Sequence, residues 1–446
     1  MMKEKKGFIC QNCGYESPKW LGRCPNCGEW NTFAEEVLKK KEKFSVKTTS
    51  PVKFKDVENV SIERINTGIN EFDRVLGGGI VKGSLILVGG DPGIGKSTLL
   101  TTISGKFSEK DKKVLYVSGE ESVYQVKLRV ERLKINDENI FFLSETEINN
   151  IIDTALKIQP ELLIIDSVQT MFSEEIELPP GSVSQVREVT FKLMNLSKSS
   201  DITTMIIGHI TKTGVIAGPK TLEHMVDTVL YLEGDTNYIF RILRTVKNRF
   251  GSTNEIGVFE LKEEGLVEIP NPSLFLIESR VKDEPGNTIV PTIQGTRPII
   301  VEIQSLITPT RYGVPMRVTT GVDYKRVNML VAIIEKRLGY GIGNYDIFCN
   351  IAGGLKVQEP AIDIGLVFSM VSSFLGKKID EDTSMIGEVG LSGEVRAVPF
   401  IEKRIEECKK MGLKKIIIPT QNVKIKDGID IVSVRTIKEA KEVLKL

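Results

Sequence analysis

A glycine-rich stretch directly after an apolar run has the residue types and spacing needed to bind phosphate groups. The pattern G-x-x-x-x-G-K-[ST] is met by Gly90, Gly95, Lys96 and Ser97, after the strand-like residues 85–88. Glycines let the chain turn tightly enough to aim several backbone N–H groups at one phosphate, and the N-terminus of the following helix adds partial positive charge. In this pattern the lysine reaches the β/γ-phosphates and the serine hydroxyl ligates Mg²⁺. The residues expected to contact the nucleotide are Gly90, Asp91, Pro92, Gly93, Ile94, Gly95, Lys96, Ser97 and Thr98.

Two carboxylates and one histidine are expected at the same edge of a sheet. Asp166 ends an apolar strand, where a second Mg²⁺-orienting carboxylate belongs in a nucleotide-hydrolysing site. Glu120 follows another strand and could orient the attacking water, and we prefer it to its neighbour Glu121. His209 ends a further strand. It is either a structural residue or a sensor of the γ-phosphate, and the sequence leaves both open.

Four of the six cysteines lie within the first 27 residues, as two Cys-x-x-Cys pairs. These are Cys10, Cys13, Cys24 and Cys27, with ten residues between the pairs. Two such turns aim four sulfurs at one centre, which suits tetrahedral Zn²⁺ and leaves no open position for catalysis. A pair of disulfides is the alternative, which a reducing compartment disfavours. The segment is therefore predicted to be a structural zinc ribbon whose folding depends on the metal.

Length and charge set broad limits. A chain of 446 residues should hold two or three domains. Lysine and arginine number 60 and aspartate and glutamate 59, so the net charge is +1 and any DNA site must be a local patch. There is no apolar run long enough to span a membrane and no leader-like start, which indicates a cytoplasmic protein.

From about residue 61 the sequence alternates between strand-like and helical patterns. This predicts an α/β fold in which a parallel sheet is covered by helices on both faces. Residues 32–60 contain a lysine cluster and little periodicity, which is typical of a linker. The polar, glycine-rich residues 211–220 form a predicted loop that either contacts DNA or is simply mobile. Lys247 and Arg249 stand at a strand end, where solvated charge is the plain interpretation.

The cysteine segment, the phosphate-binding turn and the sequence Lys247-Asn-Arg-Phe-Gly251 together resemble the bacterial RadA (Sms) family of DNA repair proteins. The resemblance covers nearly the whole chain. It implies a RecA-type P-loop ATPase core with an N-terminal zinc ribbon and a C-terminal Lon-protease-like α/β domain. The implied parts are a four-cysteine ribbon at 1–31, a linker at 32–60, the ATPase domain at 61–271 and the Lon-like domain at 272–446. The implied cofactors are ATP, Mg²⁺ and Zn²⁺.

The same resemblance implies a function. The chain would be a DNA-dependent ATPase, a helicase-like motor that acts on single-stranded and branched DNA, drives branch migration and works with the RecA recombinase in recombinational repair. It would act as a homo-hexamer, away from membranes. Lys247 and Arg249 would then be catalytic, acting on the nucleotide of the neighbouring subunit. The alternatives are a RecA-fold switch similar to the circadian clock ATPase KaiC, which signals by binding proteins, and an ATP-dependent protease.

The last third of the chain resembles the Lon protease domain through residues 354–365 and 387–396. Lon needs a serine nucleophile and a lysine that takes its proton. The serine position holds Ala361 and the lysine position holds Glu402, with Lys403 one step on and turned by about 100° on a helix. The domain is therefore expected to be proteolytically inactive, and to serve as a platform for assembly and DNA binding rather than as a passive appendage. The basic excess between residues 311 and 337 is either a local DNA patch or a solvated face, and its members are Arg311, Arg317, Lys325, Arg326, Lys336 and Arg337.

Overall fold

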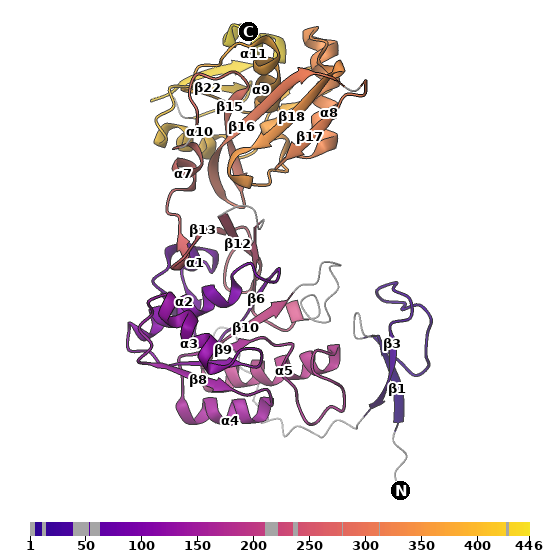
Figure 1. The fold of residues 1–446 in the computed structure, drawn as a ribbon, viewed down its shortest axis with the longest axis vertical. Coiled ribbons are helices and arrows are strands. Elements are labelled where there is room, and N and C mark those ends of the chain that lie inside the picture. Colours follow the sequence, from indigo (N-terminus) through magenta and orange to yellow (C-terminus); the bar gives the residue numbers. More distant parts are fainter. Residues whose placement is uncertain are drawn as a thin grey trace. The chain divides into compact units, whose positions relative to one another are not determined.

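The computed structural model describes residues 5–10, 15–38, 53, 63–209, 222–234, 240–278, 280–311, 313–424 and 428–446. Contacts divide the chain into two compact units (Figure 1), residues 1–234 with 241–268 and residues 235–240 with 269–446. Cys13, most of the predicted linker and the predicted loop at 211–220 lie outside the described residues. Across the described ranges, no helix is both long and apolar enough to cross a membrane.

The cysteine-rich segment forms a small antiparallel sheet. Strand β1 (Lys5–Cys10) pairs with β2 (Glu16–Ser17) on one side and with β3 (Phe33–Leu38) on the other. β3 lies within the predicted linker, so the ribbon extends beyond the boundary predicted at residue 31. The physical reason is pairing, because β3 supplies the second partner of β1 and its Phe33 packs against Cys10 and Cys24.

The rest of the first unit is built on a nine-stranded sheet with the order β14-β13-β12-β11-β6-β10-β9-β7-β8. The central strands from β11 to β8 are parallel to their neighbours, and β12 runs antiparallel to β11. The strands are β6 (Leu85–Gly90), β7 (Val114–Ser118), β8 (Ile140–Ser144), β9 (Leu162–Asp166), β10 (Thr203–His209), β11 (Thr228–Glu233), β12 (Phe240–Asn248), β13 (Ile256–Lys262) and β14 (Gly265–Glu268). A short hairpin of β4 (Arg64–Ile65) and β5 (Ile80–Val81) precedes β6.

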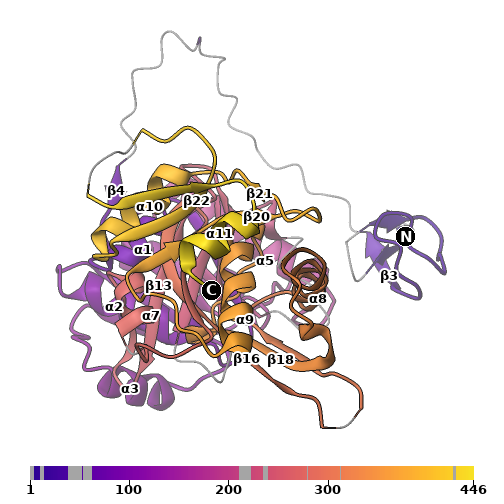
Figure 2. The same ribbon diagram turned by 90° about the horizontal axis from the view of Figure 1, so that it is seen from above.

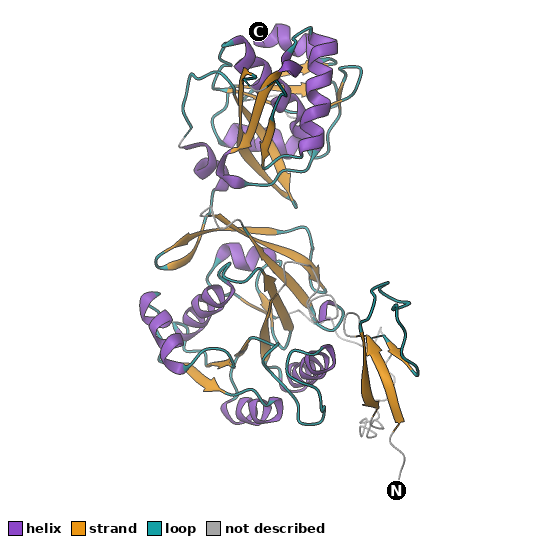
Figure 3. Cartoon of the chain, turned by 45° about the vertical axis from the view of Figure 1, so that its right-hand side comes forward, coloured by secondary structure: helices purple, strands orange, loops and turns teal. Residues whose placement is uncertain are grey.

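Helices cover both faces of this sheet (Figure 3). Successive residues of β6 point to opposite faces, so Ile86 and Val88 pack with Leu99 of α2 while Leu85 and Leu87 pack in a second cluster. The helices are α1 (Asn70–Val75), α2 (Lys96–Ser108), α3 (Val123–Arg132), α4 (Ile148–Ile158) and α5 (Val183–Ser200). The predicted α/β architecture is confirmed.

The second unit contains a mixed seven-stranded sheet with the order β17-β18-β16-β15-β19-β22-β23. α9 (Asp363–Leu375) packs against β15 and β16 (Figure 2). The strands are β15 (Asn287–Gln294), β16 (Arg297–Pro309), β17 (Arg317–Thr320), β18 (Tyr345–Ile351), β19 (Thr383–Met385), β22 (Lys415–Pro419) and β23 (Asp430–Val434), with a separate hairpin of β20 (Glu388–Val389) and β21 (Val395–Arg396). The other α-helices are α7 (Pro272–Glu278), α8 (Tyr324–Ile333), α10 (Ile401–Lys410) and α11 (Ile437–Leu444).

Candidate nucleotide site

The phosphate-binding turn joins the carboxyl end of β6 to the start of α2. Gly90, Gly93 and Gly95 have φ angles of 148°, 75° and 113°, which favour glycine. A Cβ atom at Gly90 would come within 2.5 Å of the carbonyl oxygen of Leu232, whereas one at Gly93 would meet nothing within 4 Å. The turn is thus packed tightly at its start and open at its middle, which suits a cradle for an anionic ligand at a helix N-terminus.

Lys96 is the first residue of α2 and is buried. Its Nζ donates hydrogen bonds to the carbonyl oxygens of Gly90, at 2.7 Å, and Asp91, at 2.9 Å. Burial lowers the pKa of the ammonium group, and the charges of Asp166, Asp91 and Glu120 oppose that shift. The predicted carboxylates Asp166 and Glu120 therefore both lie near the lysine of the phosphate-binding turn.

Asp166 is the last residue of β9 and is also buried. The Tyr116 hydroxyl donates a 2.6 Å hydrogen bond to its Oδ2 atom. Burial raises the pKa of the Asp166 carboxyl, while hydrogen bonds from Tyr116 and Ser97 lower it. The Ser97 hydroxyl and the Asp166 carboxylate thus lie together, and both supply the oxygen ligands that Mg²⁺ prefers.

Glu120 and Glu121 have different partners. Both carboxylate oxygens of Glu121 accept hydrogen bonds from the Arg129 guanidinium, at 3.0 and 2.5 Å. Glu120 is exposed, and its Oε1 accepts a hydrogen bond from the hydroxyl of Ser167, the residue after Asp166. The geometry therefore favours Glu120 over Glu121 as the carboxylate that faces the site.

Sequence reasoning missed Tyr116 and Arg129. The Tyr116 hydroxyl also accepts a 3.4 Å hydrogen bond from Arg129, whose Nε donates to Thr101 of α2 at 3.1 Å. These residues connect Asp166 to α2 and α3. A signal was present, because a tyrosine in the buried strand β7 usually needs a partner for its hydroxyl.

His209 lies opposite Gly90 in the parallel pairing of β10 with β6. Its backbone is therefore at the edge of the sheet that holds the phosphate-binding turn. Its side chain is not among those described, so the choice between a structural role and a phosphate sensor stays open.

Lys247 and Arg249 lie toward the amino-terminal end of strand β6, whereas the phosphate-binding turn follows its carboxyl end. Lys247 pairs with Val229, which pairs with Leu87, three residues before Gly90. At a rise of about 3.3 Å per residue, Lys247 is about 10 Å short of the end of β6. The Lys247 Nζ donates to the carbonyl oxygen of Glu223 at 2.6 Å, and burial and the charge of Arg249 lower its pKa.

Their neighbours hold this segment in place. Arg249 donates a 3.0 Å hydrogen bond to the buried Asp227 carboxylate. Asn248 donates to the Leu76 carbonyl oxygen at 3.2 Å, and Arg64 donates to that of Phe250 at 2.6 Å. Asn248 and Phe250 therefore anchor the segment, and Lys247 and Arg249 are its cationic members.

Three of the four predicted metal ligands form a cluster. The sulfur atoms of Cys10, Cys24 and Cys27 lie within 4.8 Å of one another, and those of Cys10 and Cys27 are 3.7 Å apart. Sulfurs that are bound tetrahedrally to zinc at about 2.3 Å are about 3.8 Å apart. This spacing fits a zinc site that Cys13, outside the described residues, would complete.

Three family models match the chain. The rubredoxin metal-binding domain matches residues 8–35, the AAA domain residues 48–215, and the Lon protease (S16) C-terminal proteolytic domain residues 342–445. The DNA repair protein RadA of Bacillus subtilis (strain 168) is 50% identical over 452 residues, which cover 99% of this chain and 98% of that protein. The DNA repair protein RadA of Streptococcus pyogenes serotype M1 is 51% identical over 98% of each chain. The chain belongs to the RadA family of DNA repair proteins.

The RadA membership and the fold class predicted from the motifs are thereby confirmed, and the AAA match supports an ATP hydrolase that uses ATP and Mg²⁺. Two solved structures are similar to part of the chain. One is an ATPase domain that is 15% identical, with a TM-score of 0.41, over 48% of this chain and 93% of its own. The other, a KaiC-like protein of Pyrococcus horikoshii OT3, is 21% identical, with a TM-score of 0.40, over 47% of this chain and 100% of its own.

Two residues bear on the prediction that the Lon catalytic pair is absent: Ala361, at the predicted serine position, and Lys403, one residue after Glu402 at the predicted lysine position. Ala361 is buried in an apolar cluster with Ile401 and Ile405. Lys403 is exposed, and its Nζ lies 5.6 Å from the centre of the Phe400 ring. A lysine that acts as a base in such a pair needs a buried, desolvated site, which the exposed Lys403 does not have.

The next residue of α10, Arg404, forms a partly buried ion pair with Glu359. Arg404 is 0% exposed, and its guanidinium donates to both carboxylate oxygens of Glu359, at 2.9 and 2.6 Å. Glu359 also accepts hydrogen bonds from the Thr292 hydroxyl and the Ile293 amide. The pair ties the turn before Ala361 to α10 and β15.

The basic segment of the Lon-like unit is only partly available to a ligand. Arg317 donates to the carbonyl oxygen of Gly343 at 2.6 Å, and Arg326 forms an ion pair with the buried Asp363 carboxylate. Arg337 donates to the carbonyl oxygen of Leu391. Of the six basic residues expected there, those that are exposed and have no such anchoring contact within the described ranges are Arg311, Lys325 and Lys336.

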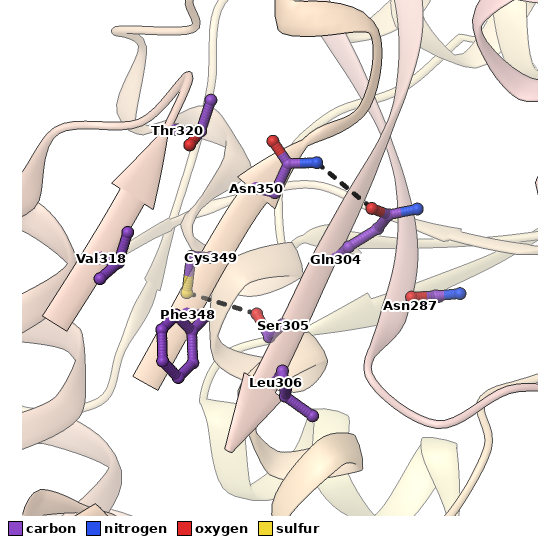
Figure 4. A pocket seen from close by; sticks show the side chains of 9 residues that line it. All are labelled: Asn287, Gln304, Ser305, Leu306, Val318, Thr320, Phe348, Cys349 and Asn350. Carbon is purple, nitrogen blue, oxygen red and sulfur yellow. Dashed lines mark hydrogen bonds between the residues drawn. The ribbon is translucent and has the colours of Figure 1, made fainter. Parts of the chain in front are cut away.

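A cavity of about 430 Å³ lies against β15, β16, β17 and β18 (Figure 4). Asn350 donates to Gln304 at 3.3 Å across its floor, and Gln304 donates to the buried Glu302 at 3.0 Å. Its lining is neutral, from Asn287, Gln304, Ser305, Leu306, Val318, Thr320, Phe348, Cys349 and Asn350. None of these residues belongs to the nucleotide site.

Proposed function

We propose that this RadA-family chain is a DNA-dependent ATPase motor that acts on single-stranded DNA and on branched recombination intermediates, together with a RecA-type recombinase. The observation that carries the proposal is the convergence of Lys96, Asp166 and Glu120 at one sheet edge, around an open glycine turn. The match to an AAA domain in a chain of a DNA repair family supports a role in which nucleotide hydrolysis drives work on DNA.

Each residue has a proposed role. Lys96 binds the β/γ-phosphates, and the backbone N–H groups of residues 90–98 other than Pro92 cradle them. Ser97 and Asp166 would hold Mg²⁺, which would neutralise charge on the phosphates. Glu120 orients the attacking water, since its carboxylate is exposed beside Asp166.

Lys247 and Arg249 are proposed to act on the nucleotide of a neighbouring subunit. Their position supports this role, because Lys247 is level with Leu87, about 10 Å along the strand direction before the end of β6 where the turn begins. A cation that arrives from a neighbour stabilises the charge that develops on the γ-phosphate. This role requires an assembly, and we propose a homo-hexamer.

The remaining parts have supporting roles in the proposal. The chain is divided into a zinc ribbon, a linker, an ATPase domain and a Lon-like domain that is proteolytically inactive. The burial of Ala361 and the exposure of Lys403 support the inactivity. The Lon-like domain would be a platform for assembly and DNA binding, to which Arg311, Lys325 and Lys336 contribute.

The test is steady-state ATP hydrolysis with and without single-stranded DNA. The wild type should be stimulated by DNA, and Lys96→Ala should lose hydrolysis in both conditions. Lys106→Ala is the matched control, because Lys106 is on the same helix but pairs with Glu109 at the surface. ATPase activity that DNA leaves unchanged would favour the alternative of a protein-binding switch.

A further inference from the structure

The zinc ribbon carries both tryptophans of the chain, and both are exposed. The sequence has two tryptophans, Trp20 and Trp30, and they are 52% and 67% exposed. Tyr15, 41% exposed, is the other exposed large apolar side chain in the described part of the ribbon. Single exposed apolar side chains are ordinary, but three aromatic ones on so small a module indicate a binding surface.

The two indole rings lie next to each other in fixed positions. A Cβ atom at Gly22 would be 3.8 Å from ring carbons of both Trp20 and Trp30. The Trp20 Nε1 donates to the carbonyl oxygen of Phe33 at 3.2 Å, which attaches this ring to β3. Phe33 in turn packs against Cys10 and Cys24, so the proposed metal site supports the ring position.

A cation lies over the second ring. The guanidinium carbon of Arg23 is 5.9 Å from the centre of the Trp30 ring. Its Nε donates to the carbonyl oxygen of Gly28 at 2.9 Å, in the turn after Cys27. The aromatic rings and the positive charge are thus positioned before any ligand arrives, which reduces the entropy lost on binding.

We propose that this surface, made of Tyr15, Trp20, Arg23 and Trp30, binds single-stranded DNA by stacking unpaired bases on its rings. Every base has a flat π-face, so such stacking does not depend on sequence, and an adjacent arginine adds a cation–π contribution. The inference rests on the proposed function, because it assigns a surface to the same single-stranded DNA.

Charge favours nucleic acid over a protein partner here. Tryptophan and arginine are also frequent in the centres of protein interfaces. The ribbon through β3, residues 1–38, contains five lysine and arginine residues against five glutamates, and residues 39–43 of the sequence add four lysines and one glutamate, for a net charge of +3 over residues 1–43. These lysines, which follow β3 directly in the sequence, would attract the phosphates that flank each stacked base.

Tryptophan fluorescence of the full-length, zinc-loaded protein tests the inference directly. Because Trp20 and Trp30 are the two tryptophans of the sequence, selective tryptophan excitation reports on the ribbon alone. Titration with a thymidine homopolymer should quench this emission. Affinity is measured in parallel by the anisotropy of a labelled copy of the same DNA.

Trp30→Ala is the main variant, because its ring is 67% exposed and its loss disturbs packing little. Loss of one stacked base should weaken DNA binding about tenfold, and Trp30→Phe should restore most of the affinity. Phe400→Ala is the matched control, since Phe400 is 56% exposed, has Lys403 over its ring and belongs to the second unit. Zinc content, measured on each variant, should be unchanged.

Three results would overturn the inference. The inference would be refuted if DNA did not quench the tryptophan emission and Trp30→Ala bound DNA with wild-type affinity. If DNA still stimulated hydrolysis in that case, the proposed function would stand. Quenching by a RecA-type recombinase but not by DNA would make the surface a protein-docking site. A wild type that neither binds single-stranded DNA nor is stimulated by it would refute the inference and the proposed function together.

Discussion

The Tyr116 hydroxyl is the contact whose removal tests the nucleotide site most sharply. It donates a 2.6 Å hydrogen bond to Asp166, the proposed Mg²⁺ ligand, and Tyr116 itself is buried in strand β7. Tyr116→Phe removes one oxygen atom and keeps the ring, which is stacked on Phe142 at 6.4 Å. The variant should therefore fold and remain a fair test of chemistry.

The expected loss follows from the kind of hydrogen bond. A bond to a charged group contributes about 1.5–3 kcal/mol, and each 1.36 kcal/mol is a factor of ten in rate. If the carboxylate must be held in place in the transition state, kcat should fall about 10- to 100-fold at neutral pH. The concentration of Mg²⁺ needed for half-maximal activity should rise as well.

The pH dependence gives a second readout, one that a loss of packing would not produce. Burial raises the pKa of Asp166, and the hydrogen bond from Tyr116 lowers it. Removing the hydroxyl therefore raises that pKa further, and less of the carboxylate is ionised in acid. The acid limb of the kcat–pH profile should move to higher pH in Tyr116→Phe.

Steady-state hydrolysis across pH and Mg²⁺ concentration is the assay, with Tyr345→Phe as the control. Tyr345 lies in the second unit, where its ring packs against Phe374, so loss of its hydroxyl should leave both profiles unchanged. An acid limb and an Mg²⁺ requirement that stay at wild-type values in Tyr116→Phe would refute the positioning of Asp166 by Tyr116.

Three further predictions concern the other parts of the chain. Lys247→Ala should lose DNA-stimulated hydrolysis while keeping nucleotide affinity, and mixing it with Lys96→Ala should restore activity if the lysine acts on a neighbour; no recovery at any ratio would place its action within its own subunit. Cys24→Ser should release the metal while the ATPase domain still unfolds cooperatively, and wild-type protein purified without chelators but lacking zinc would reject the site. The protein should not cleave unfolded casein with ATP, and ATP-dependent cleavage that disappears in Lys96→Ala would show an active protease.

Local patterns in the sequence were enough to predict the phosphate-binding turn. Apolar strand, glycines, lysine and helix follow one another within residues 85–108, so the relevant contacts are formed between near neighbours. Asp166 and Glu120 could be placed at the same edge because parallel strands end together. The cysteine pairs could likewise be interpreted by spacing alone.

Contacts between distant residues could not be predicted in this way. Tyr116 and Asp166 are separated by 50 positions, and no local pattern shows that a strand tyrosine donates to a particular carboxylate. Likewise, no local pattern shows that the fully buried Arg404 forms an ion pair with Glu359, 45 positions earlier. β3 was assigned to the linker because residues 32–60 carry a lysine cluster and little periodicity, and only its pairing with β1 identifies it as a strand.

The position of Lys247 and Arg249 relative to the phosphate-binding turn depends on the direction of strand β12. No local pattern in the sequence indicates that direction. A basic strand end could lie at either edge of a sheet. Because β12 runs antiparallel to β11, its carboxyl end lies at the amino edge of β6, level with Leu85 to Leu87 and away from the turn. These cations are therefore poorly placed to complete the nucleotide site of their own chain. If the proposed catalytic role holds, hydrolysis requires a neighbouring subunit, and assembly becomes a condition for ATP use.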